Sequence, residues 1–165
     1  YQKFDIGAMG EFDVALLLEQ YAGKAVSKKI YPEWRGGYYY AAKAKTNTAA
    51  PLGLLYVSRW SSPESAAEFA ALYAQSLKQR YKEANETGQT QLAQGDSRAP
   101  DSKAPDTQLK DDSGPTLPHL TGRHTWSTEE GTIVIEEKGE TVFVSESLDA
   151  ATTSTLEREV LSSVP

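Results

Sequence analysis

The sequence contains no cysteine among its 165 residues. Without thiols, the chain can form no disulfide, offer no cysteine nucleophile and build neither a zinc finger nor an iron–sulfur site. This absence leaves the compartment open, because an exported protein can also lack cysteine. The only methionine is Met9 and residue 1 is tyrosine, so we expect the natural reading frame to begin upstream.

Basic residues are scarce relative to acidic ones. The chain has 17 Lys and Arg against 23 Asp and Glu, a net charge of −6, and shows no basic stripe. Nucleic acids and anionic membrane surfaces attract the opposite pattern, so both are disfavoured as partners. No apolar run approaches the roughly 18 residues of a membrane-spanning helix, so we expect no membrane span.

Two segments in the first half carry helical periodicity. Gly10–Tyr21 is apolar nearly all round and has acidic residues in its first turn, which predicts a well-buried helix. Pro63–Glu83 follows Ser62 as a cap, has proline at its first helical position and repeats apolar residues at helical spacing. This pattern predicts an amphipathic helix.

Between these helices lie two extended segments. In Tyr38–Thr46, Tyr38 and Tyr40 share one face and the lysines the other, which predicts a strand whose lysine face meets water. Leu52–Trp60 is apolar on both faces and predicts a central strand. The short turn between them predicts a hairpin.

The second half begins with a change of composition. Residues 86–118 contain no aromatic residue and are rich in Pro, Asp, Ser, Thr, Gln and Gly, so we expect a low-complexity loop or insertion. Thr132–Glu137 and Thr141–Ser147 predict a hairpin, which becomes a meander if Arg123–Ser127 joins it. Asp149 is placed to cap a final helix that ends near Ser162.

The order of these elements predicts the fold class. The predicted order is helix-β-β-helix-β-β(-β)-helix. This order, with short turns between neighbouring strands, indicates an α+β fold. We expect an antiparallel sheet of four to five strands with about three packed helices, forming a single α+β domain over residues 1–165.

Three short stretches resemble one family. They are Gly10-Glu11-Phe12, Trp34-Arg35-Gly36-Gly37, and Tyr56–Trp60 followed by Ser62-Pro63-Glu64 and Ala66–Ala70. Together they look like the C-terminal domain of secreted bacterial and haloarchaeal proteins that carry a zincin-like metallopeptidase segment upstream. The resemblance covers most of the chain outside 86–118 and implies a module attached to a peptidase-like domain. The family usually shows Gly-Trp-x-Gly-Asp; here Glu33 precedes Trp34, and Gly37 stands where the acidic residue would be.

The chain does not by itself show a complete catalytic site. A zincin needs two histidines one helical turn apart with an adjacent glutamate, whereas His119 and His124 are five residues apart and no glutamate follows the first. Glu129-Glu130 and Glu136-Glu137 are neighbours that point to opposite faces of a strand or turn, and we interpret them as surface charges. Neither a Gly-x-Ser-x-Gly elbow nor a phosphate loop is present. We therefore predict no catalytic residue, no metal site and no cofactor.

The remaining candidates are aromatic residues near strand ends and the arginines beside them. Aromatic residues with a few polar groups can line a ligand or peptide groove, and they can equally be core residues. The candidate ligand-binding residues are Trp34, Arg35, Tyr39, Arg59, Trp60 and Trp126. Tyr38 and Tyr40 belong to the same aromatic cluster, and because Tyr39 lies on the lysine face of its strand, we expect it to be the most accessible of these aromatic residues.

These observations leave three functions open. The first is a non-catalytic accessory or binding module of a larger exported protein, secreted or periplasmic, with the upstream domain of the same polypeptide and a peptide or small molecule as partners. The second is a fragment of a zincin-like metallopeptidase whose metal ligands lie outside this chain. The third is a small-ligand-binding α+β domain. An exposed aromatic groove favours the first or third, whereas a large exposed apolar face near Phe12 favours the second.

Overall fold

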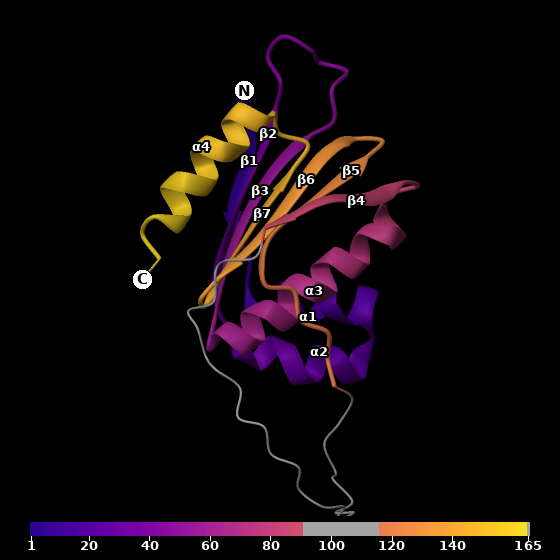
Figure 1. Ribbon diagram of the computed structural model, residues 1–165, viewed down its shortest axis with the longest axis vertical. Helices are drawn as coiled ribbons and strands as arrows, with labels where there is room; N and C mark the ends of the chain where they lie inside the picture. Colours follow the sequence, from indigo (N-terminus) through magenta and orange to yellow (C-terminus); the bar gives the residue numbers. More distant parts are fainter. Residues whose placement is uncertain (91–115, 165) are drawn as a thin grey trace, which may run out of the picture.

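A computed structural model describes residues 1–90 and 116–164 of the chain (Figure 1). The strands in this part are β1 (Gln2–Ala8), β2 (Trp34–Lys43), β3 (Gly53–Trp60), β4 (Ala84–Thr90), β5 (Gly122–Thr128), β6 (Gly131–Lys138) and β7 (Thr141–Glu146). They form one sheet in the order β1-β2-β3-β7-β6-β5-β4, and each neighbouring pair is antiparallel. The predicted α+β class is therefore confirmed, and β3 lies inside the sheet as expected.

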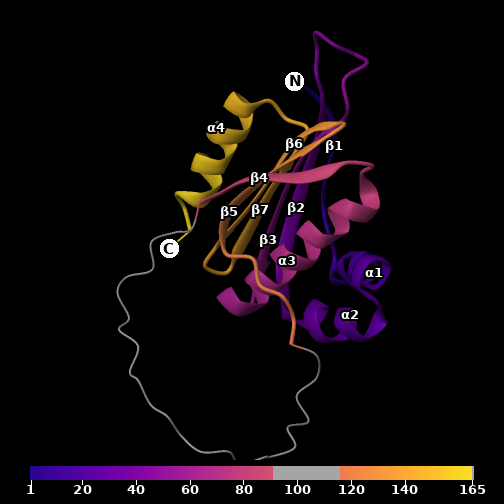
Figure 2. The same ribbon diagram turned by 45° about the vertical axis from the view of Figure 1, so that its right-hand side comes forward.

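The helices divide unevenly between the two faces of this sheet. They are α1 (Glu11–Ala22), α2 (Lys24–Ile30), α3 (Pro63–Arg80) and α4 (Ala150–Leu161), with a 3-10 turn, η1, at Tyr31–Glu33. Figures 1 and 2 show α1, α2 and α3 on one side of the sheet and α4 alone on the other. In the described part of the chain, no helix is long and apolar enough to cross a membrane.

The helix-covered face holds the main core. The indole of Trp60 stacks on Phe69 of α3, with ring centroids 4.5 Å apart, and Tyr56 and Tyr73 complete an aromatic cluster around Phe69. The N-terminus of α3 is fixed as the sequence predicts, because the Ser62 hydroxyl accepts a hydrogen bond from the Ser65 backbone N–H at 3.1 Å. From this cap, α3 packs against β3, β6 and β7.

The predicted number of elements was too small. The structure adds β1, β4 and α2, giving seven strands and four α-helices in the described residues. β4 is an edge strand with almost every side chain exposed, so it has no apolar alternation to detect. It forms because its backbone pairs with β5, which requires no particular side chain.

The predicted loop over residues 86–118 therefore starts too early. Glu86 to Thr90 belong to β4. Residues 91–115 lie outside the described part of the chain, and the described residues from Thr116 onward form no helix or strand before β5.

The first helix is less buried than predicted. Only Val14 and Leu18 of α1 are buried, whereas Phe12 is 73% exposed and Leu16 is 50% exposed. α1 contacts α2, α3, η1 and β2, which leave Phe12 and Leu16 largely exposed. When a helix is apolar on every side, its sequence does not indicate which side packs against the rest of the protein. In α1, one side remains exposed to solvent.

The two faces of β2 are also reversed relative to the prediction. Tyr39 turns toward the helix-covered core, and Tyr38 on the opposite face is 70% exposed. Of the two lysines that suggested the wet face, Lys43 is the last residue of β2 and Lys45 lies beyond the strand. Tyr39 fits because its ring lies over Gly7 of β1, where an added Cβ would approach the Tyr39 hydroxyl to 2.8 Å.

Candidate functional site

On its side of the sheet, α4 covers only part of the surface. Leu156, Val160 and Leu161 pack against Val134 and Phe143 and form a small second core. α4 packs on β7 and β6, and between α4 and the strands β1 and β2 this face is hollowed.

Two hollows follow the open side of α4, with volumes of about 650 Å³ and about 440 Å³. Tyr38 and Val57 line both, so the hollows adjoin, and we call them together the α4 groove. Their sizes fall in the range of small-ligand sites.

The two ends of the α4 groove differ in chemistry. The larger hollow carries Arg35 and Arg59, both about half or more exposed. Arg59 donates two hydrogen bonds to the Glu140 carboxylate, at 3.0 and 3.2 Å, and Arg35 donates to the backbone carbonyls of Pro32 and Trp34. The smaller hollow has no charged residue in its lining. It is formed by Tyr1, Ile6, Tyr38, Tyr39, Tyr40, Ala42, Leu55, Val57, Leu148, Thr152 and Leu156.

Two of the predicted ligand-binding residues lie in the core. Trp60 is fully buried, and its indole Nε1 donates to the Ser58 hydroxyl at 3.0 Å. Trp126 is 7% exposed and stacks on His124. Neither Trp60 nor Trp126 lines the groove. Both are core residues, which was the alternative interpretation of these aromatic side chains.

Trp34 and Tyr39 are half-buried and pack against the main core, and Tyr39 also borders the smaller hollow. The Tyr39 hydroxyl donates to Asp5 at 2.8 Å, and this hydrogen bond raises the pKa of Tyr39. Tyr39 is thus less accessible than Tyr38, contrary to prediction. In the described residues, the buried Nε1 of Trp34 and the Tyr56 hydroxyl have no hydrogen-bond partner, a situation that commonly marks a water site.

Of the six predicted residues, Arg35 and Arg59 are those brought together in the larger hollow, and the residue between the two hollows is Tyr38. Tyr38 was not among the predicted binding residues, because the alternation of this strand placed its side chain on the face opposite the lysines. Three consecutive tyrosines carry no difference in polarity, so alternation alone could not decide which of them faces water.

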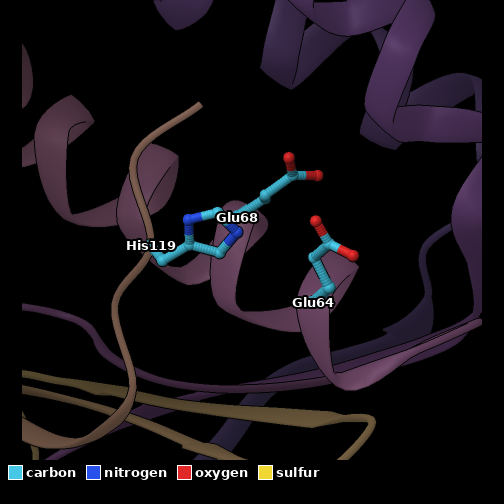
Figure 3. A group of neighbouring side chains, drawn as sticks. All are labelled: Glu64, Glu68 and His119. Atoms are coloured by element: carbon cyan, nitrogen blue, oxygen red, sulfur yellow. The ribbon is translucent and has the colours of Figure 1, made fainter. Parts of the chain in front are cut away.

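A second cluster lies at the start of α3. Glu64 and Glu68, four residues apart on one face of the helix, meet His119 from the segment before β5 (Figure 3). One ligand atom from each residue lies within 4.8 Å of the others. Carboxylates and imidazoles are metal ligands, and in the described residues this is the only group of three or more such side chains at that spacing.

The other histidine is occupied elsewhere. His124 Nδ1 pairs with Glu86 Oε1 at 2.6 Å, and its Nε2 faces the Thr121 carbonyl oxygen at 3.1 Å. The spacing of the two histidines gave no metal-site pattern, and nothing in the sequence pattern linked His119 to the glutamates of α3. The i, i+4 spacing of Glu64 and Glu68 was readable, but their proximity to His119 depends on tertiary structure.

Glu146 is the centre of a buried ionic network. Its carboxylate accepts two hydrogen bonds from Arg80, at 2.6 and 2.8 Å, and one each from the hydroxyls of Tyr73 and Tyr81, at 2.6 and 2.7 Å. Four donors saturate the carboxylate. Burial raises the pKa of Tyr73, and the Glu146 charge and hydrogen bond raise it further. We assign this network a structural role.

A cleft of about 420 Å³ under the other side of α4 contains a carboxylate pair. Burial, together with the hydrogen bond and charge of Glu157 on α4, raises the pKa of Glu136 on β6 to about 8, and Arg123 and Lys138 oppose the rise. Arg123 also pairs with Glu157 at 2.6 Å.

The prediction that Glu136 and Glu137 are surface charges was wrong, because Glu136 faces α4 and Glu137 is buried on the opposite face. Their placement on opposite faces was right.

Comparison with family models matches residues 3–113 to a family described as a domain of unknown function, DUF8575. Searches of curated proteins and of solved structures found no match. The matched range spans two thirds of the chain and contains β1–β4 and α1–α3, whereas β5–β7 and α4 follow it. The chain belongs to the DUF8575 family.

Proposed function

We propose that this chain is a non-catalytic binding module of a larger exported protein and that the α4 groove is its binding site. The observation that carries this proposal is the exposure of Tyr38. An aromatic side chain that is 70% exposed on β2, one strand in from the sheet edge and between two adjoining hollows, is poorly explained by folding alone.

The lining of the groove favours a peptide segment that carries apolar side chains and an acidic residue. Tyr38 offers a flat apolar surface, and the smaller hollow beside it accepts an aliphatic or aromatic side chain. At the other end, Arg35 and Arg59 offer guanidinium groups that match a carboxylate. Two hollows in succession suit consecutive side chains of an extended peptide better than one compact molecule.

The test uses anilinonaphthalene sulfonate, whose aromatic rings and anionic group resemble this ligand, as a fluorescent probe. We expect about one probe per chain in the native state, displaced by the peptide acetyl-Leu-Phe-Ser-Asp-amide. Tyr38→Ser should weaken probe binding about tenfold, as for a central aromatic contact. Arg59→Gln should weaken it less, about threefold, because this cation is exposed and already paired.

The matched control is Phe12→Ser, which removes an equally exposed aromatic from α1. It should leave probe binding unchanged. Loss of binding in the Phe12 variant but not in the Tyr38 variant would place the binding surface on α1 and overturn the proposal. Displacement of the probe by dodecanoate but not by the peptide would mean that the groove binds a lipid-like ligand and not a peptide.

A second candidate function is part of a zincin-like metallopeptidase whose metal ligands lie outside this chain. The exposure of Phe12 and Leu16, one turn apart on α1, favours it, because such a bare apolar strip suits contact with another domain.

This candidate is tested on the product of the complete reading frame. It requires about one tightly bound zinc ion and zinc-dependent cleavage of casein, both reduced by the double change Phe12→Ser and Leu16→Ser and both retained in Tyr38→Ser. A complete product that neither binds zinc outside this chain nor cleaves casein would eliminate it.

A further inference from the structure

We propose that Glu64, Glu68 and His119 bind a divalent transition-metal ion, with Zn²⁺ as the best match to their chemistry. This site is separate from the α4 groove and does not depend on the proposed function. Two carboxylates from successive turns of α3 and an imidazole from the segment before β5 converge at one point (Figure 3).

The spacing of the three groups suits a metal ion. Their ligand atoms lie within 4.8 Å of one another. Tetrahedral binding at about 2.1 Å from each donor separates the donors by about 3.4 Å. Glu64 and His119 are exposed, so rotation of their side chains can close the remaining distance without moving the backbone.

Glu68 supplies an independent indication that a cation belongs here. The residue is 6% exposed, and its Oε1 accepts a single contact from Lys29 Nζ at 3.3 Å. Charge-assisted contacts of this kind are usually about 2.7–2.9 Å, so the compensation is weak. Among the described residues, Oε2 accepts no hydrogen bond. Oε2 keeps some contact with solvent, so one oxygen of this largely buried carboxylate is open to a further positive charge.

The segment that carries His119 is held against α3. The backbone N–H of Leu120 donates to the Ala67 carbonyl oxygen at 3.0 Å, and Leu117 is buried in the main core. His119 lies between these two anchors, so the position of its backbone is fixed beside the glutamates. Metal sites require ligands that are preorganised before the ion binds, and the fixed backbone of His119 meets this requirement.

The donor set narrows the choice of metal. One imidazole with two carboxylates favours Zn²⁺, and to a smaller extent Mn²⁺, over Ca²⁺, which prefers six or more oxygen ligands. Three protein ligands leave at least one position for water. The ion would displace Lys29 from Glu68 and tie the segment before β5 to α3.

The experiment is calorimetric titration of the chelator-treated chain with ZnCl₂. We expect one ion per chain, a rise in Tm of several degrees at saturating zinc, and at least tenfold weaker binding in His119→Ala, Glu64→Gln and Glu68→Gln. Glu11→Gln is the matched control, because Glu11 is also an exposed glutamate in the first turn of a helix. It should not change the affinity.

Two further measurements separate a metal site from a merely structural cluster. Lys29→Met removes the competing cation and should tighten zinc binding several-fold. In the nitrogen-15 spectrum of the two imidazoles, zinc should shift His119 and leave His124 in place. Three results would overturn the proposal: a zinc dissociation constant of about 1 mM or weaker, unchanged zinc binding in His119→Ala, or a nitrogen-15 shift of His124 alone.

Discussion

The two faces of the sheet use alternate residues of the same strands in different ways. On the helix-covered face, Tyr56 and Trp60 of β3 and Val142 and Val144 of β7 pack beneath α3. On the other face, the intervening Val57 and Phe143 belong to the small core under α4, the only helix on this side in the described residues, and a hollow lies over β1 and β2. The difference follows from how many helices the chain places on each side.

This contrast suggests a division of labour between the faces. The covered face is closed by aromatic stacking and by the saturated carboxylate of Glu146, so its groups are committed to stability. The α4 face keeps exposed aromatic and cationic groups that are not needed to close a core. Binding sites are commonly built on such a partly covered surface supported by a rigid one.

The largest expected effect is at Glu146 on the covered face. Glu146→Ala leaves the Arg80 guanidinium partly buried without its carboxylate and should lower the free energy of unfolding by about 3–5 kcal/mol in urea denaturation. The control is Glu140→Ala at the rim of the α4 groove, where the pair with Arg59 is exposed and its loss should cost less than about 1 kcal/mol. Equal losses in the two variants would contradict the division between the faces.

A smaller effect is expected from a pair of leucines, one on each side of the sheet. Leu77 of α3 is fully buried in the main core, and Leu161 of α4 is 5% exposed in the second, smaller core. We expect Leu77→Ala to cost about 4 kcal/mol and Leu161→Ala about 2 kcal/mol, because α4 can settle into the space left behind. Thermal and urea unfolding of both variants measure the difference; a larger loss at Leu161 would mean that α4 is as firmly packed as α3.

The smallest effect is a pH dependence that belongs to the α4 face. Because the folded pKa of Glu136 is raised to about 8 from 4.5, the folded chain holds this proton where the unfolded chain has lost it. Stability should therefore fall as pH rises from about 4.5 to about 8 and then level off. Water screens this half-buried carboxyl, so the slope is modest.

Glu136→Gln should remove most of that slope in urea unfolding measured from pH 5 to pH 9. Glu137, whose pKa is also raised by burial, leaves a residual slope of the same sign. A slope that is unchanged in Glu136→Gln would assign the pH dependence to another group.

Several local features were predictable because they depend on neighbouring residues in the chain. Ser62 and Asp149 cap α3 and α4, each through a hydrogen bond from the backbone N–H three residues on. The hairpin of β6 and β7 and the addition of β5 followed from short turns and alternation. By contrast, β4 has no apolar pattern, so only its pairing with β5 reveals it.

The candidate sites were predictable only in part, because they also depend on contacts between distant segments. The sequence identified Arg35 and Arg59 as candidates beside aromatic residues, but it could not tell that Trp60 and Trp126 would be buried while Tyr38 remained exposed. It also could not bring His119 to the glutamates of α3. Both results depend on which residues distant in the chain become neighbours.

The sequence by itself determined the α+β class, the absence of thiol chemistry, the capped helices and the C-terminal meander, because periodicity and capping act over a few residues. The tertiary structure alone decided which face of β2 meets water, how much of the sheet α4 covers, and that Glu64, Glu68 and His119 meet. Those outcomes depend on burial and contact between distant segments, and local patterns do not encode the order in which strands pair.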